Sequence, residues 1–569
     1  MLIVLALVLG APAGAAAAPA ITVTDFTLAP AAPDAGASVD ASSSTSLSYA
    51  NSTEDVKKTI GHFAPGLLAN PETVPHCPQA QYLADACPAD TLIGSSSGEI
   101  DTIPNTGITT TVTGRIYNQE LLEGEAGRLG IILDTPVTKT FLTAPFYVRS
   151  NGDYGLDGVL DDLPRALTQL GVGNTQIKRL SFTLFGVVNG RKFTRGPTNC
   201  SLHVSTGEAF GYDDPTAVKD GPVSSYTPTN CDKLPFKPTF SIAVGSKGTT
   251  GERDHPSLAV HVTQGAGEAG ISANGVTLPF ELGPNLGAFD VLCTSAQLAA
   301  DACPAGSRVG TTTATSNFVG TPLSGPVYLV QQPGVILPAL VADLRGRVHV
   351  QLTIANTILG GRLIKSTVTG VPDLPVSTFD LALDAGPGSP LENKFDLCRK
   401  GARPRAMSAD VTFTGQNGAT VTSKPPVHVP GCGPVPAVSL RKAASRRPSL
   451  RLRLQRHPDG GKLARFTLKL PKQLRLNRSQ VRRQAQAIAS KKLARSAVSV
   501  KGRRTVTVSG LPKGGASTIS LRLDKGAVRL TAKARRKARR GQLRLSYKIA
   551  AVEVDGDRFS AGASSRARR

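Results

Sequence analysis

A cysteine-bearing block that occurs twice constrains this chain more than any other feature. Residues 77–94 read CPQAQYLADACPADTLIG, and residues 293–310 read CTSAQLAADACPAGSRVG. A block repeated at this length indicates a tandem duplication. Cysteines at the same spacing in both copies are typical of exported proteins, whose disulfides form in an oxidising compartment. The block therefore predicts two repeats that are each cross-linked by disulfides, but it does not indicate an enzymatic reaction.

The eight cysteines divide into four per repeat. An even number in the same order indicates a disulfide framework, and repetition reduces the 105 pairings that eight cysteines allow. We favour the pairs nearest in sequence: Cys77–Cys87, Cys200–Cys231, Cys293–Cys303 and Cys398–Cys432. Closing such loops stabilises the fold by about 2.7 kcal/mol for the short ones and about 3.7 kcal/mol for the long ones in the chain-entropy description.

Zinc binding is the alternative for these cysteines. Structural zinc sites use cysteines two to four residues apart, with a second pair or histidines. Here nine residues separate the cysteines of each short pair, and the eight histidines, from His62 to His457, stand alone in the sequence. We therefore expect neither a metal site nor a cofactor.

The pattern of the chain predicts an all-β fold, with tandem β-sandwich-like repeats and a basic C-terminal β domain with short helices. Thr-rich and alternating stretches favour strands. Asn-Gly pairs at residues 189–190, 274–275 and 417–418 predict hairpin turns. We expect a signal peptide at 1–20, β repeats at 21–239 and 240–435, and the basic domain at 436–569.

Three stretches predict helices. Asp161-Asp162-Leu163-Pro164 begins a turn or two that ends at Gly171, with proline near the first helical position. A second helix begins near Ser479, and a short basic helix covers 532–540 and stops at Gly541.

The N-terminus has the pattern of a secretory signal. An apolar stretch from Leu2 to Leu9 precedes the small residues of an Ala18-Pro19-Ala20 cleavage site. The alternative is a retained membrane anchor, which Pro12, Pro19 and the glycines disfavour. We expect a protein that is secreted or located in the cell envelope, with no membrane span after cleavage.

Charge is distributed unevenly along the chain. Residues 441–569 hold 37 Lys and Arg against 5 Asp and Glu, whereas residues 1–440 hold 28 against 36. Leucines alternate with arginines around 450–455, which predicts strands with one cationic face. The candidate contacts for an anionic cell-envelope polymer are Arg451, Arg453, Arg535, Arg536, Lys537, Arg539 and Arg540.

Two alternatives bear on this basic domain. Its cations could form an ordinary solvated surface. Specific nucleic-acid recognition is not expected, because base stacking needs exposed aromatic side chains and the domain holds only Phe466, Tyr547 and Phe559.

Several motifs resemble those of a known group of proteins. FAPGLLANP at 63–71, followed by the Cys77–Cys87 block and Gly94, resembles the pattern PPGL…NP…C…CPA[DG]S.[VI]G. PTNC at 197–200 and NCDKLPFKP at 230–238 resemble the unit ending NPT.C…NC..LPFKP. Both patterns belong to an uncharacterised family of large exported repeat proteins of high-GC Gram-positive bacteria. The resemblance covers roughly 45–435, although the second repeat lacks the PPGL and LPFKP elements. It implies export and β architecture and supplies no catalytic residues.

Two motifs formally suggest other chemistry. Gly94-Ser95-Ser96-Ser97-Gly98 matches the nucleophile-elbow pattern, but that motif needs a strand before it and a helix after it, so we interpret it as a loop. Residues 151–162 hint at a calcium loop but lack its glycine and its final glutamate, so we expect a polar β-turn.

These observations favour a non-catalytic structural or adhesion-type protein of the cell surface. The alternative is an exported hydrolase whose site assembles only in three dimensions. A catalytic site in one repeat should leave that copy polar and distinctive, whereas the copies share cysteine, proline, glycine and apolar residues.

Overall fold

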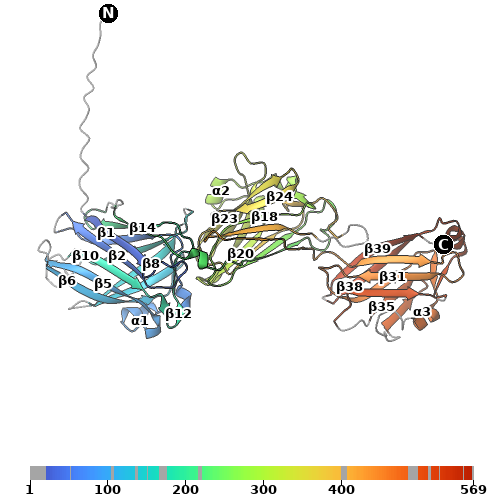
Figure 1. Cartoon of the computed structure of the whole chain (residues 1–569), viewed down its shortest axis with the longest axis horizontal. Coiled ribbons are helices and arrows are strands. Elements are labelled where there is room, and N and C mark those ends of the chain that lie inside the picture. The colour runs from blue at the N-terminus through green and yellow to red at the C-terminus, as the bar shows by residue number, and fades with distance from the viewer. Residues whose placement is uncertain are drawn as a thin grey trace, which may run out of the picture.

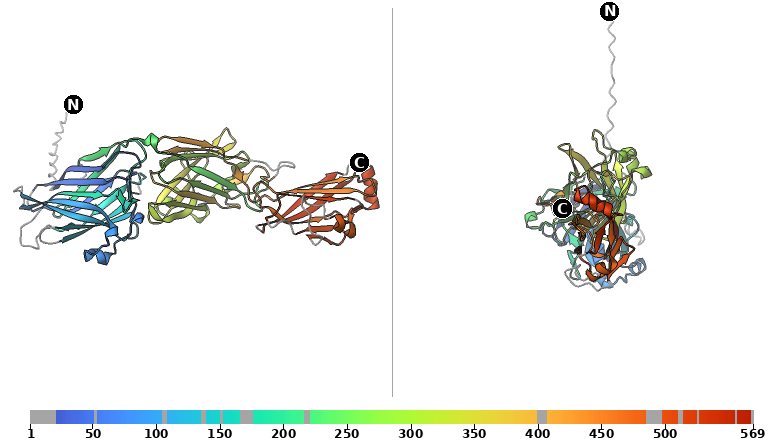
Figure 2. Two further views of the ribbon diagram at one scale, coloured as in Figure 1. Left: turned by 60° about the horizontal axis from the view of Figure 1, so that its bottom comes forward. Right: turned by 90° about the vertical axis from the view of Figure 1, so that its right-hand side faces the viewer.

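The computed structural model shows three β-rich bodies that follow one another in a row (Figures 1 and 2). It describes residues 21–50, 53–103, 108–134, 139–149, 152–165, 176–215, 221–398, 407–484, 497–509, 514–524, 526–554 and 556–566. About 52% of the chain is strand and 8% is helix, so the all-β prediction is confirmed. The expected signal peptide at 1–20 lies outside the described residues, and the domain boundaries stay predictions.

The first repeat is built on one large antiparallel sheet. The described residues contribute eleven strands. In their order across the sheet these are β1 (Ile21–Pro30), β2 (Ala41–Tyr49), β10 (Gln176–Leu184), β5 (Leu92–Ile103), β6 (Ile108–Asn118), β7 (Gly127–Asp134), β8 (Lys139–Val148), β9 (Leu156–Leu160), β3 (Val56–Phe63), β14 (His203–Gly211) and β15 (Val223–Tyr226).

The second repeat has the same strand order, with one further strand at an edge. Across the sheet its strands are β29 (Val427–His428), β16 (Thr239–Val244), β17 (Leu258–Thr263), β25 (Thr378–Leu383), β20 (Arg308–Ser316), β21 (Val319–Val330), β22 (Ala339–Leu344), β23 (Val350–Leu359), β24 (Leu363–Val368), β18 (Ile271–Thr277), β27 (Asp410–Gly415) and β28 (Thr420–Ser423). From β16 to β28, each strand has its counterpart in the first sheet at the same place.

Each large sheet curls toward closure as a barrel, instead of splitting into two separate layers. In the first repeat, the Leu28 backbone N–H on β1 donates to Ser224 Oγ on β15 at 2.8 Å, and that hydroxyl donates to the Leu28 carbonyl at 3.0 Å. In the second repeat, the Val427 N–H donates to the Met407 carbonyl at 2.8 Å, while β29 pairs with β16. Closure leaves few unpaired strand edges, which are the sites where sheets aggregate.

Short two-stranded sheets flank the barrels; the first two pairs below occupy matching places in the two repeats, and the third belongs to the first repeat. They are β4 (Leu68–Ala69) with β13 (Thr194–Arg195), β19 (Leu282–Pro284) with β26 (Leu391–Asn393), and β11 (Val187–Val188) with β12 (Arg191–Lys192).

The repeated cysteine blocks fold into equivalent loops against the barrels. Each contains a short helix, α1 (Gln79–Leu83) or α2 (Ser295–Ala299), and a disulfide, Cys77–Cys87 or Cys293–Cys303. Cys200–Cys231 and Cys398–Cys432 are the other two bridges, and none of the described cysteines is free. These are the sequence-local pairs that we favoured above.

The described residues of the basic domain form three β-sheets around one core. One sheet contains β30 (Val435–Arg441), β31 (Ser449–Gln455) and β36 (Thr518–Leu523). A second contains β34 (Val498–Lys501), β35 (Thr505–Val508), β32 (Leu463–Lys469), β38 (Arg544–Glu553) and β39 (Arg558–Arg566). The third pairs β33 (Leu474–Leu476) with β37 (Val528–Leu530). Helices α3 (Arg478–Gln484) and α4 (Ala532–Arg539) complete the domain. The buried core includes Leu450, Phe466, Leu521 and Tyr547. This part of the chain is therefore a folded domain and not a disordered stretch of charged residues.

Two local predictions are wrong, and a third is not tested by the described residues. Asn274-Gly275 lies inside β18 and not in a hairpin turn, because the pairing of β18 with both β24 and β27 outweighs the local turn preference. The serines at 95–97 lie inside β5, paired on both sides, and not in a loop. The short helix expected after Asp161-Asp162-Leu163-Pro164 falls mostly on 166–171, which lie outside the described residues; just before it, the buried Leu163 donates its N–H to the Lys57 carbonyl.

The other turn and helix predictions agree with the structure wherever their residues are described. Asn189-Gly190 forms the turn between β11 and β12, with positive φ at both residues. Asn417-Gly418 joins β27 to β28. Helix α4 ends at Arg539, two residues before Gly541, as expected. Helix α3 begins at Arg478, and the predicted end at Gly171 lies outside the described residues.

Candidate functional site

The outer faces of the basic domain are cationic because apolar and basic residues alternate along its strands. On β31 the side chains of Leu450, Leu452 and Leu454 are buried. The side chains between them, Arg451 and Arg453, therefore lie on the opposite, outer face. In the pairing of β31 with β36, Arg451 stands directly opposite Arg522.

Three further cross-strand pairs in this domain place two cations opposite each other. Lys469 pairs with Lys548, Arg475 with Arg529, and Arg544 with Arg566. Like charges directly opposite in an antiparallel ladder are destabilising. The domain therefore keeps a surface that costs stability in the isolated molecule.

Helix α4 adds the other predicted cations. Ala534 and Ala538 face the core, so Arg536, Lys537 and Arg539 are exposed, Arg535 is half-buried and Arg540 forms the exposed C-cap. The helix lies at the far end of the row, beyond the sheets of the domain (Figure 2). Arg451 and Arg453 thus lie on a sheet and the other five candidates on a helix terminus.

Of the described acidic residues of this domain, Asp459 and Glu553 are engaged away from the cation pairs, whereas Asp524 pairs with Arg522. Asp459 pairs with His428 at 2.9 Å and lies 3.4 Å from His457. Asp524 contacts Ser449 and Arg522, and Glu553 is buried and accepts from the Gly461 N–H. Little negative charge remains to neutralise the exposed cations.

A second polar cluster holds the two repeats together. Asp373, between β24 and β25, is buried against Thr198, which follows β13 of the first repeat. The Thr198 N–H and hydroxyl donate to the two Asp373 carboxylate oxygens at 2.5 and 2.6 Å. Arg195 lies buried nearby; burial lowers the pKa of its guanidinium, which Asp373 partly opposes. Its Nη2 donates to the Glu268 carbonyl at 3.1 Å.

Further bonds extend this junction. Tyr154, in the turn between β8 and β9, donates its hydroxyl to the Gln351 carbonyl at 3.0 Å and accepts from the Gln351 N–H at 3.2 Å. Asn417 Nδ2 donates to the Cys231 and Leu234 carbonyls at 3.2 and 3.1 Å. These contacts and the Thr198–Asp373 pair fix the relative position of the two barrels.

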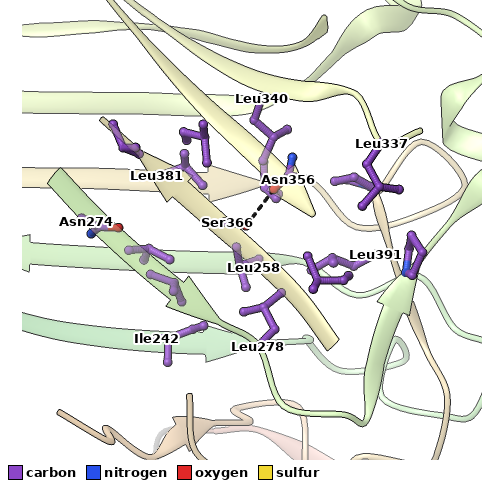
Figure 3. Close-up of a pocket in the computed structure, with 18 of the residues that line it drawn as sticks. Ile242, Leu258, Asn274, Leu278, Leu337, Leu340, Asn356, Ser366, Leu381 and Leu391 are labelled. Carbon is purple, nitrogen blue, oxygen red and sulfur yellow. Dashed lines mark hydrogen bonds between the residues drawn. The ribbon is translucent and has the colours of Figure 1, made fainter. Parts of the chain in front are cut away.

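The barrel interiors are apolar and incompletely filled. In the second repeat a cavity of about 120 Å³ is lined by residues that include Ile242, Leu258, Leu340, Ile364, Leu381 and Leu391 (Figure 3). Three polar side chains join them. Ser366 donates to Asn356 Oδ1 at 2.7 Å, Asn356 Nδ2 donates to the Pro338 carbonyl at 3.0 Å, and Asn274 lies across the cavity. The first barrel holds a similar cavity of about 140 Å³.

The motifs that suggested other chemistry are accounted for by their contacts. In the calcium-like segment, Arg149 binds the carboxylates of Asp153 at 2.9 Å and Asp157 at 2.6 Å, so both are neutralised by a guanidinium. Asn151 lies outside the described residues. Ser96, the central serine of the elbow-like motif, is buried in β5. Among the residues whose placement is described, no cluster of three or more His, Cys, Asp or Glu could hold a metal ion.

The sequence did not point to the Thr198–Asp373 pair, the cation pairs or the cavities. Strand register places Lys469 opposite Lys548 and Arg475 opposite Arg529, and register cannot be read from alternation within a single strand. Within the described part of the chain, no helix is both long and apolar enough to span a bilayer.

No protein-family model matches the sequence, and no curated protein matches it. Among solved structures, the Enterococcus faecalis MSCRAMM ACE aligns with a TM-score of 0.17 and 11% identity, over 57% of this chain and 94% of its own. BcpA, the major pilin subunit of Bacillus cereus, gives 0.18 and 9%, over 84% and 95%. The B domain of a biofilm associated protein gives 0.16 and 7%, over 58% and 84%. The similarity to these bacterial surface proteins is distant and assigns no family.

Proposed function

We propose that this chain is an exported, non-catalytic protein of the cell envelope. Its two barrels act as a stiff spacer or adhesive body, and its basic domain holds an anionic envelope polymer through many dispersed charges. The cross-strand cation pairs carry this proposal.

The cation pairs support a polyanionic partner on energetic grounds. Arg451–Arg522, Lys469–Lys548, Arg475–Arg529 and Arg544–Arg566 each place like charges on one face. Bringing a polymer of negative charge to these faces turns a repulsion into an attraction. Solubility alone does not need such an arrangement, because interspersed charges of both signs serve it.

The spacer role is supported by the construction of the repeats. Both barrels are stapled by two disulfides each, and buried hydrogen bonds such as Thr198–Asp373 lock their junction. The basic domain follows at one end of the row (Figure 1). A stiff row with its cations at one end can hold a polymer there and project the other end away from it.

The proposal is tested by binding of the full chain to immobilised polygalacturonate and polyphosphate. One variant replaces Lys469, Lys548, Arg475 and Arg529 with serine. The matched control replaces four exposed cations of the repeats, Lys192, Lys233, Lys237 and Arg308, with serine. We expect the first variant to elute at clearly lower salt than the unaltered chain, and the control to elute close to it. Equal losses in both variants would show that only net charge matters and would contradict a binding surface on the basic domain.

A further inference from the structure

We propose that the barrel of the second repeat binds a single-chain amphiphile: the end of a medium-length alkyl chain enters the cavity, and the rest of the chain and the polar head stay at the barrel mouth. This inference is independent of the polymer-binding role of the basic domain. It rests on the cavity, on the surface that borders it, and on the difference between the two repeats at this end of the barrel.

The cavity is suited to an alkyl chain by its lining. Apart from Asn274, Asn356 and Ser366, its lining side chains are apolar, and none is charged. Inward-facing Phe240, Val260 and Val368 are only partly buried, so the core packing is incomplete around the cavity. A dry apolar cavity of roughly 150 Å³ in another protein accepts a benzene-sized molecule. The 120 Å³ available here therefore accommodates a short length of hydrocarbon.

Loops that lead into the cavity lining carry exposed apolar side chains. We define the rim as Phe280, Leu286, Ile336 and Phe395. Ile336 is 95% exposed and Leu286 is 67% exposed, and the rings of Phe280 and Phe395 pack edge to face with centroids 5.8 Å apart. Exposed apolar side chains that contact one another, as these two phenylalanines do, mark binding surfaces, whereas single ones do not.

The rim lies beside the residues that line the cavity. Ile336 precedes Leu337, which lines it, and Phe280 follows Leu278, which also lines it. The Leu278 N–H donates to the Ile364 carbonyl at 2.9 Å, and the Lys394 N–H donates to the Glu281 carbonyl at 2.7 Å. These bonds hold the loops that carry Phe280 and Phe395 at one end of the barrel.

The first repeat shows what covers the equivalent end in its own barrel. Leu68, Ala69, Ala126 and Leu156 line the first cavity and also line a second, apolar cleft of about 110 Å³, whose opposite wall is formed by the second repeat. The first barrel therefore opens onto the junction between the repeats. In the second barrel, the rim side chains at this end remain exposed.

The absence of charged side chains from the cavity lining decides the orientation of the ligand. Burying an ionised group without a partner costs far more than an alkyl chain gains. The chain must therefore enter first and leave its head in solvent beside the rim. Each buried methylene contributes about 0.8 kcal/mol, so affinity should rise steeply with chain length.

Calorimetric titration of the full chain with decanoate below its micelle concentration tests the proposal, with butyrate as the short-chain comparison. Ile336→Asp removes an exposed rim side chain without disturbing the core, and Val260→Phe fills the cavity. Leu202→Asp alters a similarly exposed leucine of the first repeat, 64% exposed, and is the matched control. Thermal unfolding of each variant shows whether it is folded.

We expect one saturable decanoate site, with butyrate bound at least tenfold more weakly. We expect Ile336→Asp and Val260→Phe each to weaken binding by about tenfold, the effect of losing one buried aliphatic contact, and Leu202→Asp to leave it unchanged. Three results would overturn the proposal: no binding, equal binding by all variants, or attachment to phosphatidylcholine vesicles without binding of monomeric decanoate. If Val260→Phe fails to fold, Ile336→Asp alone decides between these outcomes.

Discussion

Thr198 of the first repeat donates both its backbone N–H and its hydroxyl to the carboxylate of Asp373 of the second, at 2.5 and 2.6 Å. Thr198 and Asp373 are 1% and 5% exposed, and the Thr198 hydroxyl also accepts from the Gly270 N–H at 2.9 Å. Charge-assisted bonds between buried groups are stronger and more directional than neutral ones at a surface. The pair therefore sets the angle and spacing of the two barrels.

Replacing Asp373 with alanine should destabilise the junction. The change leaves two buried donors on Thr198 without their acceptor. It also removes the carboxylate whose charge partly offsets the lowering of the Arg195 pKa by burial. Hydrogen bonds to a charged group contribute about 1.5–3 kcal/mol each, so the loss should be at least of that size. Denaturant unfolding measures the loss, and small-angle scattering measures whether the row of domains bends.

The matched control for this change is Asp384→Ala, because Asp384 is an exposed carboxylate of the same repeat. It should alter the free energy of unfolding by less than about 0.5 kcal/mol. A double-mutant cycle with Thr198→Val isolates the pair, and additive losses in that cycle would show that Thr198 and Asp373 do not stabilise one another.

The mature protein should contain four local disulfides and no free thiol. The pairs are Cys77–Cys87, Cys200–Cys231, Cys293–Cys303 and Cys398–Cys432. Peptide mapping without reduction checks them. A peptide that links Cys77 to Cys200, or a thiol that reacts in the native exported protein, would contradict this pairing.

The stability of the second repeat should fall in acid through Asp343. Burial disfavours its carboxylate, but hydrogen bonds from His349, Gln351 and Arg345 lower its pKa below the usual value. Because the folded pKa lies below the unfolded value of about 3.9, the stabilisation is present above that pH and is lost as the pH falls through the folded pKa.

Asp343→Asn should therefore cost about 1.5–3 kcal/mol at pH 7, the range for hydrogen bonds to a charged group, and progressively less below about pH 4. Unfolding at a series of pH values measures the difference. The control is Asp380→Asn, because Asp380 is half-exposed and pairs with an exposed His261. A penalty for Asp343→Asn that stays constant down to pH 2 would contradict the assignment.

Local patterns predicted much of the fold. Alternation of leucine and arginine predicted β31, because burying one face of a strand demands a period of two. The basic stretch at 532–540, followed by Gly541, predicted α4. The wrong predictions lie where residues far apart in sequence determine the local structure. Asn274-Gly275 has the composition of a turn, but the neighbouring strands on both sides hold it extended.

The candidate surfaces were less predictable for the same reason. The basic composition pointed to the domain, yet it did not place Lys469 opposite Lys548, because the register belongs to two strands that are far apart in sequence. The Thr198–Asp373 pair joins residues 175 positions apart. The apolar cavities depend on how the barrels close, and no local motif encodes that closure.

Retention of the full chain on purified cell wall, followed from low to high salt, is the most direct test of the polymer-binding role. Exposed charges are screened within about 8 Å at physiological ionic strength. Binding through dispersed cations should therefore be strong at low salt and weaken continuously as salt rises, with no single arginine substitution abolishing it. Retention that ignores salt, or that one substitution removes, would reveal a specific pocket instead. No retention at low salt would mean that the cations of the basic domain are only a solvated surface.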